Sequence, residues 1–368
     1  MTELKLLVVD DSAMYRQALK NIVQKIPGVE CIGTASNGEE AMRKIVADKP
    51  DVVTLDMEMP IMSGMEVIEA VTEQKIDTKL VIVSACSQSG AEKAIMALKL
   101  GAYDFITKPD RLGGGSASEN IGKQLSEKIQ ALRVSTSKPS RPTSPALTQA
   151  RNNTARRTAN GTAILPTPLK VASPILVRPK AIVVGCSTGG PKALLKLFSG
   201  LKGGLNLPVF VVQHMPPLFT QTLASSINEI TSVTVKEAED REKPLPNYAY
   251  IAPGGRQMKL VVVDGDIEIQ ITDDQPSNFC KPSVDYFFSS VADVYGSNTL
   301  AVILSGMGND GTEGLRKIKQ NSGVRVLGQN EASSVVYGMP RVAMEAGLVD
   351  QQWDIADMPA AIESVIRH

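Results

Sequence analysis

The sequence predicts an α/β protein with two doubly wound parallel sheets joined by a flexible connector, and three observations support this prediction. Short β-favouring apolar runs alternate with helical segments over residues 1–130, and the same alternation resumes over residues 179–368. Residues 131–178 between them show no sustained apolar period. Polar side chains follow several of the predicted strands, where folds of this class place their ligands.

The composition narrows the class of protein. Apolar residues make up 43% of the 368 positions and charged residues 21%, which is an ordinary soluble balance, and a formal net charge of zero indicates neither nucleic acid nor an anionic membrane surface as a partner. The four cysteines lie far apart without CxxC spacing, which argues against a zinc site or a disulfide framework and fits a reducing cytosol. We find no signal-peptide pattern and no apolar stretch long enough to span a membrane, so a cytoplasmic protein without membrane insertion is expected.

The first domain reads as five βα repeats. The predicted strands are Leu4–Val9, Glu30–Ala35, Val52–Leu55, Leu80–Val83 and Tyr103–Thr107. The predicted helices begin near Ser12, Gly38, Gly64, Gly90 and Ser118. Repeats of this length imply a (βα)5 domain with a parallel, doubly wound sheet.

Polar residues at the ends of these strands are expected to meet at one edge of the sheet. They are Asp10, Asp11, Asp56, Ser84 and Lys108. Crowded carboxylates repel one another, and a hard divalent cation such as Mg²⁺ relieves that repulsion through oxygen ligands. The ion could orient a phosphoryl group for attack by one carboxylate, while the lysine and the hydroxyl contact the phosphate. Any one of these aspartates alone is better explained as a helix cap or a turn residue.

Three segments of this domain resemble the response-regulator receiver family. They are Leu-Leu-Val-Val-Asp-Asp-Ser at residues 6–12, Asp-Val-Val-Thr-Leu-Asp-Met-Glu-Met-Pro at residues 51–60, and Gly-Ala-Tyr-Asp-Phe-Ile-Thr-Lys-Pro at residues 101–109. The resemblance implies that Asp56 accepts a phosphoryl group from a chemotaxis histidine kinase. It further implies a Mg²⁺ site formed by Asp10, Asp11, Asp56 and the Glu58 carbonyl. Ser84 and Lys108 would contact the phosphoryl group, and Phe105 would be the aromatic switch residue.

Residues 131–178 are predicted to form a flexible basic linker, because they are rich in Ser, Thr, Pro and Arg. They belong to a longer acid-free tract, since no Asp or Glu occurs between Glu127 and Glu229. The arginines could bind an acidic partner, although solvation of a disordered tether is the simpler explanation.

The second domain, residues 179–368, is again predicted to be α/β and doubly wound. The predicted strands are Ala181–Val184, Pro208–Gln213, Val233–Glu237, Leu300–Ser305 and Val324–Gly328. A small antiparallel excursion is expected over Tyr248–Ala252, Met258–Val263 and Ile267–Ile271, with Asp264-Gly265 as a hairpin turn. The βα units are too few for an eight-fold barrel.

Three residues with hydrolytic potential follow separate strands of this sheet. Ser187 lies in a turn that opens a helix at Pro191, and His214 and Asp310 follow two other strands. A hydroxyl, an imidazole and a carboxylate are the parts of a hydrolytic triad. Gly185-x-Ser187-x-Gly189 matches the nucleophile-elbow pattern, but the order Ser, His, Asp is not that of α/β-hydrolases. Taken alone, Ser187 is somewhat better explained as a turn residue, and His214 as a capped or buried structural histidine.

A rival interpretation concerns Gly306-Met-Gly-Asn-Asp-Gly311, which fits the dinucleotide-binding pattern G-x-G-x-x-G between a strand and a helix. Glu331 follows the next strand, as that pattern requires. Asp310, however, would place a negative charge beside the pyrophosphate, and Ser187 and His214 would have no role.

Several motifs of the second domain closely resemble the catalytic domain of the chemotaxis protein-glutamate methylesterase/glutaminase family. They are Gly-Cys-Ser-Thr-Gly-Gly-Pro, Val-Val-Gln-His-Met-Pro-Pro-Leu-Phe-Thr, Ile-Ala-Pro-Gly-Gly, Lys-Pro-Ser-Val-Asp and Ser-Gly-Met-Gly-Asn-Asp-Gly. The resemblance makes Ser187 the nucleophile, His214 the base and Asp310 the orienting acid. Thr188, Gly189 and Met307 would line the substrate and oxyanion site. Cys186 and the segment Asn278–Lys281 depart from the family pattern.

The resemblance also implies the partners and the control of the enzyme. Its substrates would be methyl-accepting chemoreceptors, whose glutamate methyl esters are hydrolysed and whose glutamines are deamidated. The catalytic domain would need no cofactor, and the protein would be a monomer. The unphosphorylated receiver would cover the catalytic cleft until Asp56 is phosphorylated.

Overall fold

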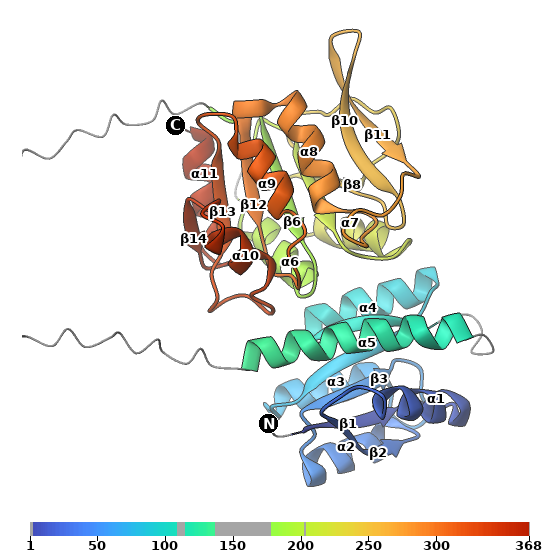
Figure 1. Cartoon of the computed structure of the whole chain (residues 1–368). Helices are drawn as coiled ribbons and strands as arrows, with labels where there is room; N and C mark the ends of the chain where they lie inside the picture. The colour runs from blue at the N-terminus through green and yellow to red at the C-terminus, as the bar shows by residue number, and fades with distance from the viewer. Residues whose placement is uncertain (1–2, 109–114, 137–177, 202–203, 368) are drawn as a thin grey trace, which may run out of the picture.

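The computed structural model describes residues 3–108, 115–136, 178–201 and 204–367, which form two α/β units (Figure 1). The last helix of the first unit ends at Thr136 and the first strand of the second begins at Ala181. Most of the predicted linker, residues 137–177, lies outside the described residues. Among the described helices, none combines the length and apolar character that a bilayer crossing requires.

The N-terminal unit has a five-stranded parallel sheet of order β2-β1-β3-β4-β5. Its strands are β1 (Leu4–Val9), β2 (Val29–Ala35), β3 (Val52–Asp56), β4 (Lys79–Ala85) and β5 (Asp104–Lys108). Its helices are α1 (Ala13–Val23), α2 (Gly38–Asp48), α3 (Gly64–Glu73), α4 (Gln88–Leu100) and α5 (Gly115–Thr136). The predicted (βα)5 fold is therefore present.

Local capping explains where several of these helices begin. Ser12, Asn37, Ser63 and Ser87 each accept a hydrogen bond from a backbone N–H of the first turn of α1, α2, α3 and α4. At α3 the cap is reciprocal, since Glu66 in turn accepts from the backbone of Ser63. The caps of α1, α2 and α4 lie just beyond a strand, so the loops after β1, β2 and β4 are short and fixed at both ends, whereas the loop between β3 and α3 is longer.

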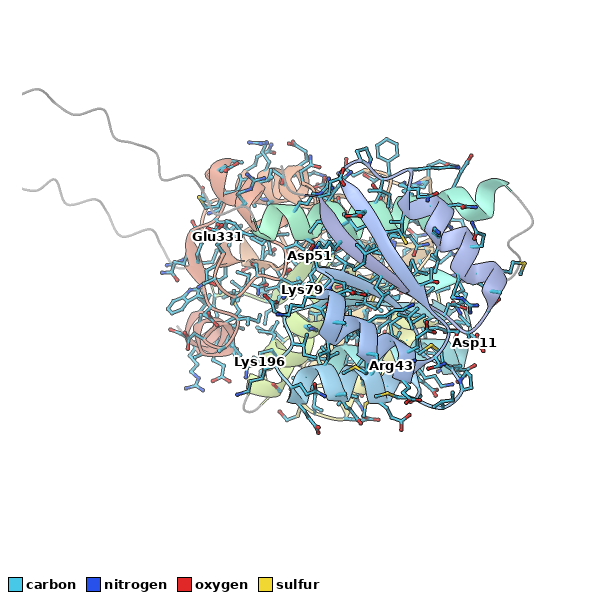
Figure 2. All side chains as sticks on the ribbon, turned by 90° about the horizontal axis from the view of Figure 1, so that it is seen from below. Asp11, Arg43, Asp51, Lys79, Lys196 and Glu331 are labelled. Carbon is cyan, nitrogen blue, oxygen red and sulfur yellow. The ribbon has the colours of Figure 1, made fainter. Side chains whose placement is uncertain are left out.

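The strand order reverses between β1 and β3, and this switch point determines which residues meet. Asp11 lies at the edge of the sheet formed by the carboxyl ends of the strands, whereas Asp51 and Lys79 lie at the opposite edge (Figure 2). Side chains that follow β1, β3, β4 and β5 therefore share one edge.

The C-terminal unit has a seven-stranded parallel sheet of order β14-β13-β12-β6-β7-β9-β8. Its strands are β6 (Ala181–Cys186), β7 (Val209–Gln213), β8 (Thr234–Glu237), β9 (Tyr248–Ile251), β12 (Thr299–Ile303), β13 (Arg325–Gln329) and β14 (Gln351–Trp353). Its α-helices are α6 (Gly190–Gly200), α7 (Phe219–Asn228), α8 (Val284–Val294), α9 (Thr312–Lys319), α10 (Met339–Glu345) and α11 (Met358–Arg367), and a short 3₁₀ turn covers Gly296–Asn298.

One predicted element of this unit has a different place. Tyr248–Ile251 is a parallel strand between β7 and β8, not part of an antiparallel excursion. The hairpin consists of β10 (Gln257–Val263) and β11 (Asp266–Thr272) alone. Its two-residue turn has positive φ at both Asp264 and Gly265, 52° and 90°, as a primed hairpin turn requires.

The two units pack against each other through α4, α5 and β5 of the first and α6, α7 and neighbouring loops of the second (Figure 1). The ring of Phe105 stacks on that of Phe219, with centroids 4.7 Å apart and planes 4° from parallel. Val336 is buried in one cluster with α5 residues such as Leu125. An ion pair between Lys99 of the first unit and Glu229 of the second, with 3.8 Å between nitrogen and oxygen, adds to this interface.

Candidate active site

The site of the C-terminal unit lies at the carboxyl ends of β6 and β12, the two neighbouring strands between which the strand order switches. From β6 the chain continues to β7 on one side of this point, and from β12 it continues to β13 on the other side. Ser187 follows β6, His214 follows β7 and Asp310 follows β12. Three residues from distant parts of the chain are thereby brought to one crevice.

The turn that carries Ser187 is fixed by backbone hydrogen bonds. The N–H of Ser187 donates to the carbonyl of Ser305 at 3.0 Å, and the N–H of Gly190 donates to the carbonyl of Ser187 at 2.8 Å. Gly189 has φ of 76°, a conformation that a side chain disfavours, and an added Cβ would collide with Val335. The Ser187 hydroxyl is therefore held at a fixed position.

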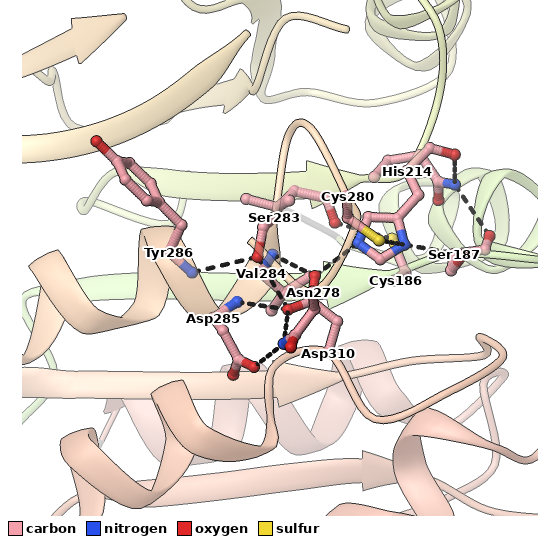
Figure 3. Close-up of polar contacts among 12 residues, drawn as sticks. Cys186, Ser187, His214, Asn278, Cys280, Ser283, Val284, Asp285, Tyr286 and Asp310 are labelled. Carbon is pink, nitrogen blue, oxygen red and sulfur yellow. Dashed lines mark hydrogen bonds and ion pairs between the residues drawn. The ribbon is translucent and has the colours of Figure 1, made fainter. Parts of the chain in front are cut away.

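His214 lies between the hydroxyl and the carboxylate (Figure 3). Its Nδ1 is 3.1 Å from Ser187 Oγ, and its Nε2 is 2.8 Å from Asp310 Oδ2. Because a carboxylate accepts, Nε2 carries the proton of the neutral imidazole, and in that form the lone pair of Nδ1 faces the serine. The arrangement can take a proton from Ser187 while Asp310 stabilises the imidazolium that results.

Asp310 is held by the start of α8 and by Asn278, which precedes that helix in the chain (Figure 3). Its carboxylate accepts from Ser283 Oγ (2.9 Å), Val284 N (2.7 Å), Asp285 N (3.0 Å) and Asn278 Nδ2 (3.1 Å). Burial alone raises the pKa of Asp310, but these bonds and the one from His214 lower it well below its usual range. The carboxylate therefore stays ionised at neutral pH.

A second carboxyl, Asp285, lies beside Asp310 and behaves differently. It accepts from the backbone N–H of Gly314 at 2.7 Å and from the Asn278 amide. Burial and the neighbouring charge of Asp310 raise the pKa of Asp285 to about 6. Asn278, Ser283 and Asp285 were missed as site residues, although Ser283 and Asp285 belong to a motif that carries the resemblance stated above.

The pKa of His214 departs from that of an ordinary histidine. Burial lowers it, but the hydrogen bond to Asp310 and the neighbouring Cys280 thiol outweigh burial and raise the pKa to about 9. An ordinary histidine has a pKa of roughly 6–7.

The three residues predicted to line the substrate site surround Ser187. Among the described residues, the backbone N–H groups of Thr188, Gly189 and Met307 have no protein acceptor. Ser187, Thr188 and Met307 line a cavity of about 420 Å³. Its opposite wall is α5 of the N-terminal unit, from which Lys128 donates to Thr188 Oγ1 at 3.1 Å and pairs with Asp104 at 2.6 Å. The first unit therefore covers the crevice of the second.

A second cluster of functional side chains lies at the switch point of the N-terminal sheet. Lys108 Nζ is 2.8 Å from Asp10 Oδ2 and 2.7 Å from Asp56 Oδ2. Asp56 and Lys108 line a cavity of about 360 Å³, together with Ser84, Glu58 and Asp11. Burial raises the pKa of Asp56 more than Lys108 lowers it, so this carboxylate is held in an unfavourable environment.

The donor set of this cluster fits a hard divalent cation. One oxygen each of Asp10, Asp11 and Asp56 lies within 4.8 Å of the others, and Asp10 and Asp56 are buried. Asp11 is exposed, and carboxylate oxygens are the ligands that Mg²⁺ prefers.

The dinucleotide interpretation does not fit the geometry. Asp310, the fifth residue of that pattern, directs its carboxylate to His214 and α8 rather than leaving the start of α9 free for a phosphate. Gly306 is close to Met339 and Ser187 rather than to an open binding surface.

Comparison with known proteins gives consistent matches for both units. Residues 182–362 match the CheB methylesterase family, and residues 6–113 match the response regulator receiver domain family. A protein-glutamate methylesterase/protein-glutamine glutaminase of Desulfotalea psychrophila is 41% identical over 95% of both chains. The enzyme of the same name from Bacillus subtilis is 38% identical over 99% of both chains. The crystal structure of the Thermotoga maritima CheB methylesterase catalytic domain is 38% identical, with a TM-score of 0.49 over 51% of this chain and 100% of that one.

Proposed function

Because the chain belongs to the protein-glutamate methylesterase/protein-glutamine glutaminase family, we propose that Ser187, His214 and Asp310 hydrolyse glutamate methyl esters and glutamine amides on the cytoplasmic helices of chemoreceptors. The observation that carries this proposal is the unbroken line of hydrogen bonds from Ser187 Oγ through His214 to Asp310, at 3.1 and 2.8 Å. The protein would act in the cytoplasm, as a monomer.

In the first half of the reaction, Ser187 Oγ attacks the side-chain carbonyl carbon while its proton passes to His214 Nδ1. The tetrahedral intermediate collapses as His214 returns that proton to the leaving group. Methanol departs from an ester and ammonia from an amide, and both leave the same acyl-serine. Asp310 keeps its charge throughout and stabilises the imidazolium.

Water completes the reaction at the same site. His214 takes a proton from water, whose oxygen attacks the acyl carbon, and the proton then returns to Ser187 Oγ as the glutamate carboxylate leaves. Backbone N–H groups of Thr188, Gly189 and Met307 are the candidates for stabilising the oxyanion in both halves, because they have no other acceptor among the described residues. These steps need only the named residues and water.

The chain segment that carries Ser187 and His214 would not repel an acidic substrate helix. A receptor segment that gains glutamates becomes more negative with each turnover. The tract between Glu127 and Glu229, which carries Ser187 and His214, contains no Asp or Glu to repel it.

The test is methanol release from a methylated chemoreceptor, with a glutamine-bearing receptor assayed in parallel for ammonia. We expect both products from purified full-length protein. Retention of the protein on an immobilised dinucleotide without either product would contradict the proposal.

The pH profile should reflect the raised pKa of His214. Only the neutral imidazole accepts the Ser187 proton, so activity should fall as pH decreases through the pKa of about 9. The midpoint of kcat/KM should lie clearly above the ordinary value of ~6.5. Initial rates across the alkaline range, with circular dichroism as a folding control, would measure it. A midpoint of roughly 6–7 would contradict the arrangement described here.

The N-terminal unit is proposed to control the enzyme by phosphorylation of Asp56 from a chemotaxis histidine kinase. Asp10, Asp11, Asp56 and the Glu58 carbonyl would hold Mg²⁺, which neutralises crowded carboxylates and orients a phosphoryl donor. Lys108 and Ser84 would contact the phosphoryl group. Phe105 lies in β5, which pairs with β4, and its ring stacks on Phe219 of the catalytic unit, so its reorientation would loosen the contact between the units.

Replacing the phosphoacceptor should uncouple this control without changing the catalytic site. Asp56→Asn should leave basal methanol release near the wild-type rate and abolish its increase with a small phosphodonor and Mg²⁺. Asp77→Asn is the matched control, since this aspartate is exposed and pairs only with the adjacent Lys79. Stimulation of Asp56→Asn to the wild-type extent would rule out Asp56 as the phosphoacceptor.

A further inference from the structure

A thiol faces the same imidazole nitrogen as Ser187. Cys280 Sγ lies 3.7 Å from His214 Nδ1, on the nitrogen whose lone pair is directed at Ser187 Oγ (Figure 3). The thiol is carried by a tight turn in which the backbones of Ser277 and Cys280 exchange hydrogen bonds of 2.8 and 3.2 Å. Cys280 also lines the active-site cavity, so it is reached from the same space as the substrate.

This spacing fits a shared metal ion better than a strong hydrogen bond. A tetrahedral Zn²⁺, with bonds of about 2.3 Å to sulfur and about 2.0 Å to nitrogen, holds those two atoms roughly 3.5 Å apart. Ser187 Oγ, 3.1 Å from the same nitrogen, is placed as a third donor. His214, Cys280 and Asp310 form one of the two groups of metal-ligating side chains found among the described residues.

The imidazole is also oriented as a metal ligand would be. Asp310 binds the opposite nitrogen at 2.8 Å and is itself fixed by donors from α8. A carboxylate behind a histidine fixes the tautomer and raises the basicity of the nitrogen that faces the metal. Asp310 would therefore support the ion from the outer shell without moving.

From this geometry we propose that Cys280 Sγ and His214 Nδ1, with Ser187 Oγ beside them, form a Zn²⁺ site whose occupancy inhibits the hydrolase. Zn²⁺ binding displaces the thiol proton to solvent and, below the pKa of His214, the Nδ1 proton as well. The ion then uses the imidazole lone pair, so that His214 can no longer accept the Ser187 proton. The inhibitory effect rests on the proposed function, whereas the binding itself does not.

The two proposed metal sites favour different ions, because their donor atoms differ. A thiolate and an imidazole select Zn²⁺, while the carboxylates at Asp10, Asp11 and Asp56 suit Mg²⁺. Lys128 faces the catalytic cavity and would oppose a cation there, but its charge is largely compensated by Asp104, 2.6 Å away. The wide spacing of the cysteines in the sequence argued against a zinc site, and the fold brings Cys280 to a histidine 66 residues earlier.

The test is a Zn²⁺ titration of methanol release by full-length protein, with excess Mg²⁺ present to fill the carboxylate cluster. Each variant is normalised to its own metal-free rate. Wild type and Cys86→Ser, an exposed control thiol, should be inhibited alike and recover with a chelator. Cys280→Ser should need at least ~10-fold more Zn²⁺ for half inhibition, since even outer-shell partners are worth 10–100-fold in affinity. Equal half-inhibitory concentrations in all three proteins would overturn the proposal.

A binding measurement keeps this test independent of the hydrolytic mechanism. Co²⁺ in place of Zn²⁺ should give a thiolate-to-metal charge-transfer band in wild type, in Cys86→Ser and in Ser187→Ala, but not in Cys280→Ser. If the band appears in a protein that releases no methanol, the proposed function fails and the metal site stands. If the band is missing from folded wild type, the metal site fails whatever the activity.

Discussion

Ser187→Ala should remove methanol release almost completely, on the order of 10⁶-fold, because His214 and Asp310 have no nucleophile left to activate. The loss should appear in kcat rather than in binding. The substitution deletes one hydroxyl from a turn whose backbone bonds do not involve that side chain, so the fold should persist. The measurement is methanol release under single-turnover conditions, with thermal unfolding as the folding control.

A matched variant in the same crevice sharpens that experiment. Ser283→Ala also removes one hydroxyl, but this hydroxyl donates to Asp310 at 2.9 Å and caps α8 by accepting from Tyr286 N. Ser283 is not among the residues that line the catalytic cavity. We expect a far smaller loss there, because Val284 N and Asp285 N still hold the carboxylate. If Ser187→Ala were to keep a rate comparable to that of Ser283→Ala, Ser187 would not be the nucleophile.

Deleting residues 1–140 should raise the basal rate, because α5 forms one wall of the catalytic cavity in the intact chain. The C-terminal sheet is built only from strands of its own unit, so its fold should survive the deletion. The linker predicted over residues 131–178 would keep the receiver at an effective concentration on the order of millimolar, so that a modest interface would close most molecules. If ~90% are closed, the rate should rise about tenfold. The comparison is specific activity of truncated and unphosphorylated full-length protein on one methylated receptor.

A charge-reversal pair tests the same contact in the full-length chain. In the wild-type protein, Lys99 Nζ lies 3.8 Å from Glu229, and Lys99→Glu would replace this attraction by repulsion. Basal activity should rise only slightly, because an exposed ion pair stabilises a contact by ~1 kcal/mol or less. Adding Glu229→Lys should restore the low rate.

If the enzyme that lacks residues 1–140 is folded yet no faster than the full-length protein, steric inhibition is wrong, and the receiver would instead recruit the enzyme to its substrate.

How much of this molecule can be predicted from its sequence depends on the range of the interactions involved. Alternating apolar runs and capping residues are local, and they predict both sheets and the strand ends at Ser187, His214 and Asp310. Tyr248–Ile251 was misplaced because a short strand beside a hairpin has no local signal for its pairing partner. Contacts between distant segments were out of reach for the same reason. The approach of Cys280 to His214 and the cap that Asn278 and α8 form over Asp310 depend on tertiary packing.

Because α5 forms one wall of the catalytic cavity, its docking there has a thermodynamic consequence for signalling. If a receptor helix and α5 compete for the same space, phosphorylation favours receptor binding by weakening docking. The free energy of that effect must equal the free energy by which bound receptor favours the phosphorylated receiver. Receptor would then act as an effector of the receiver as well as its target. Molecules engaged with substrate would hold their phosphoryl group in a larger equilibrium proportion than idle ones, and the signal would be concentrated where unfinished substrate remains.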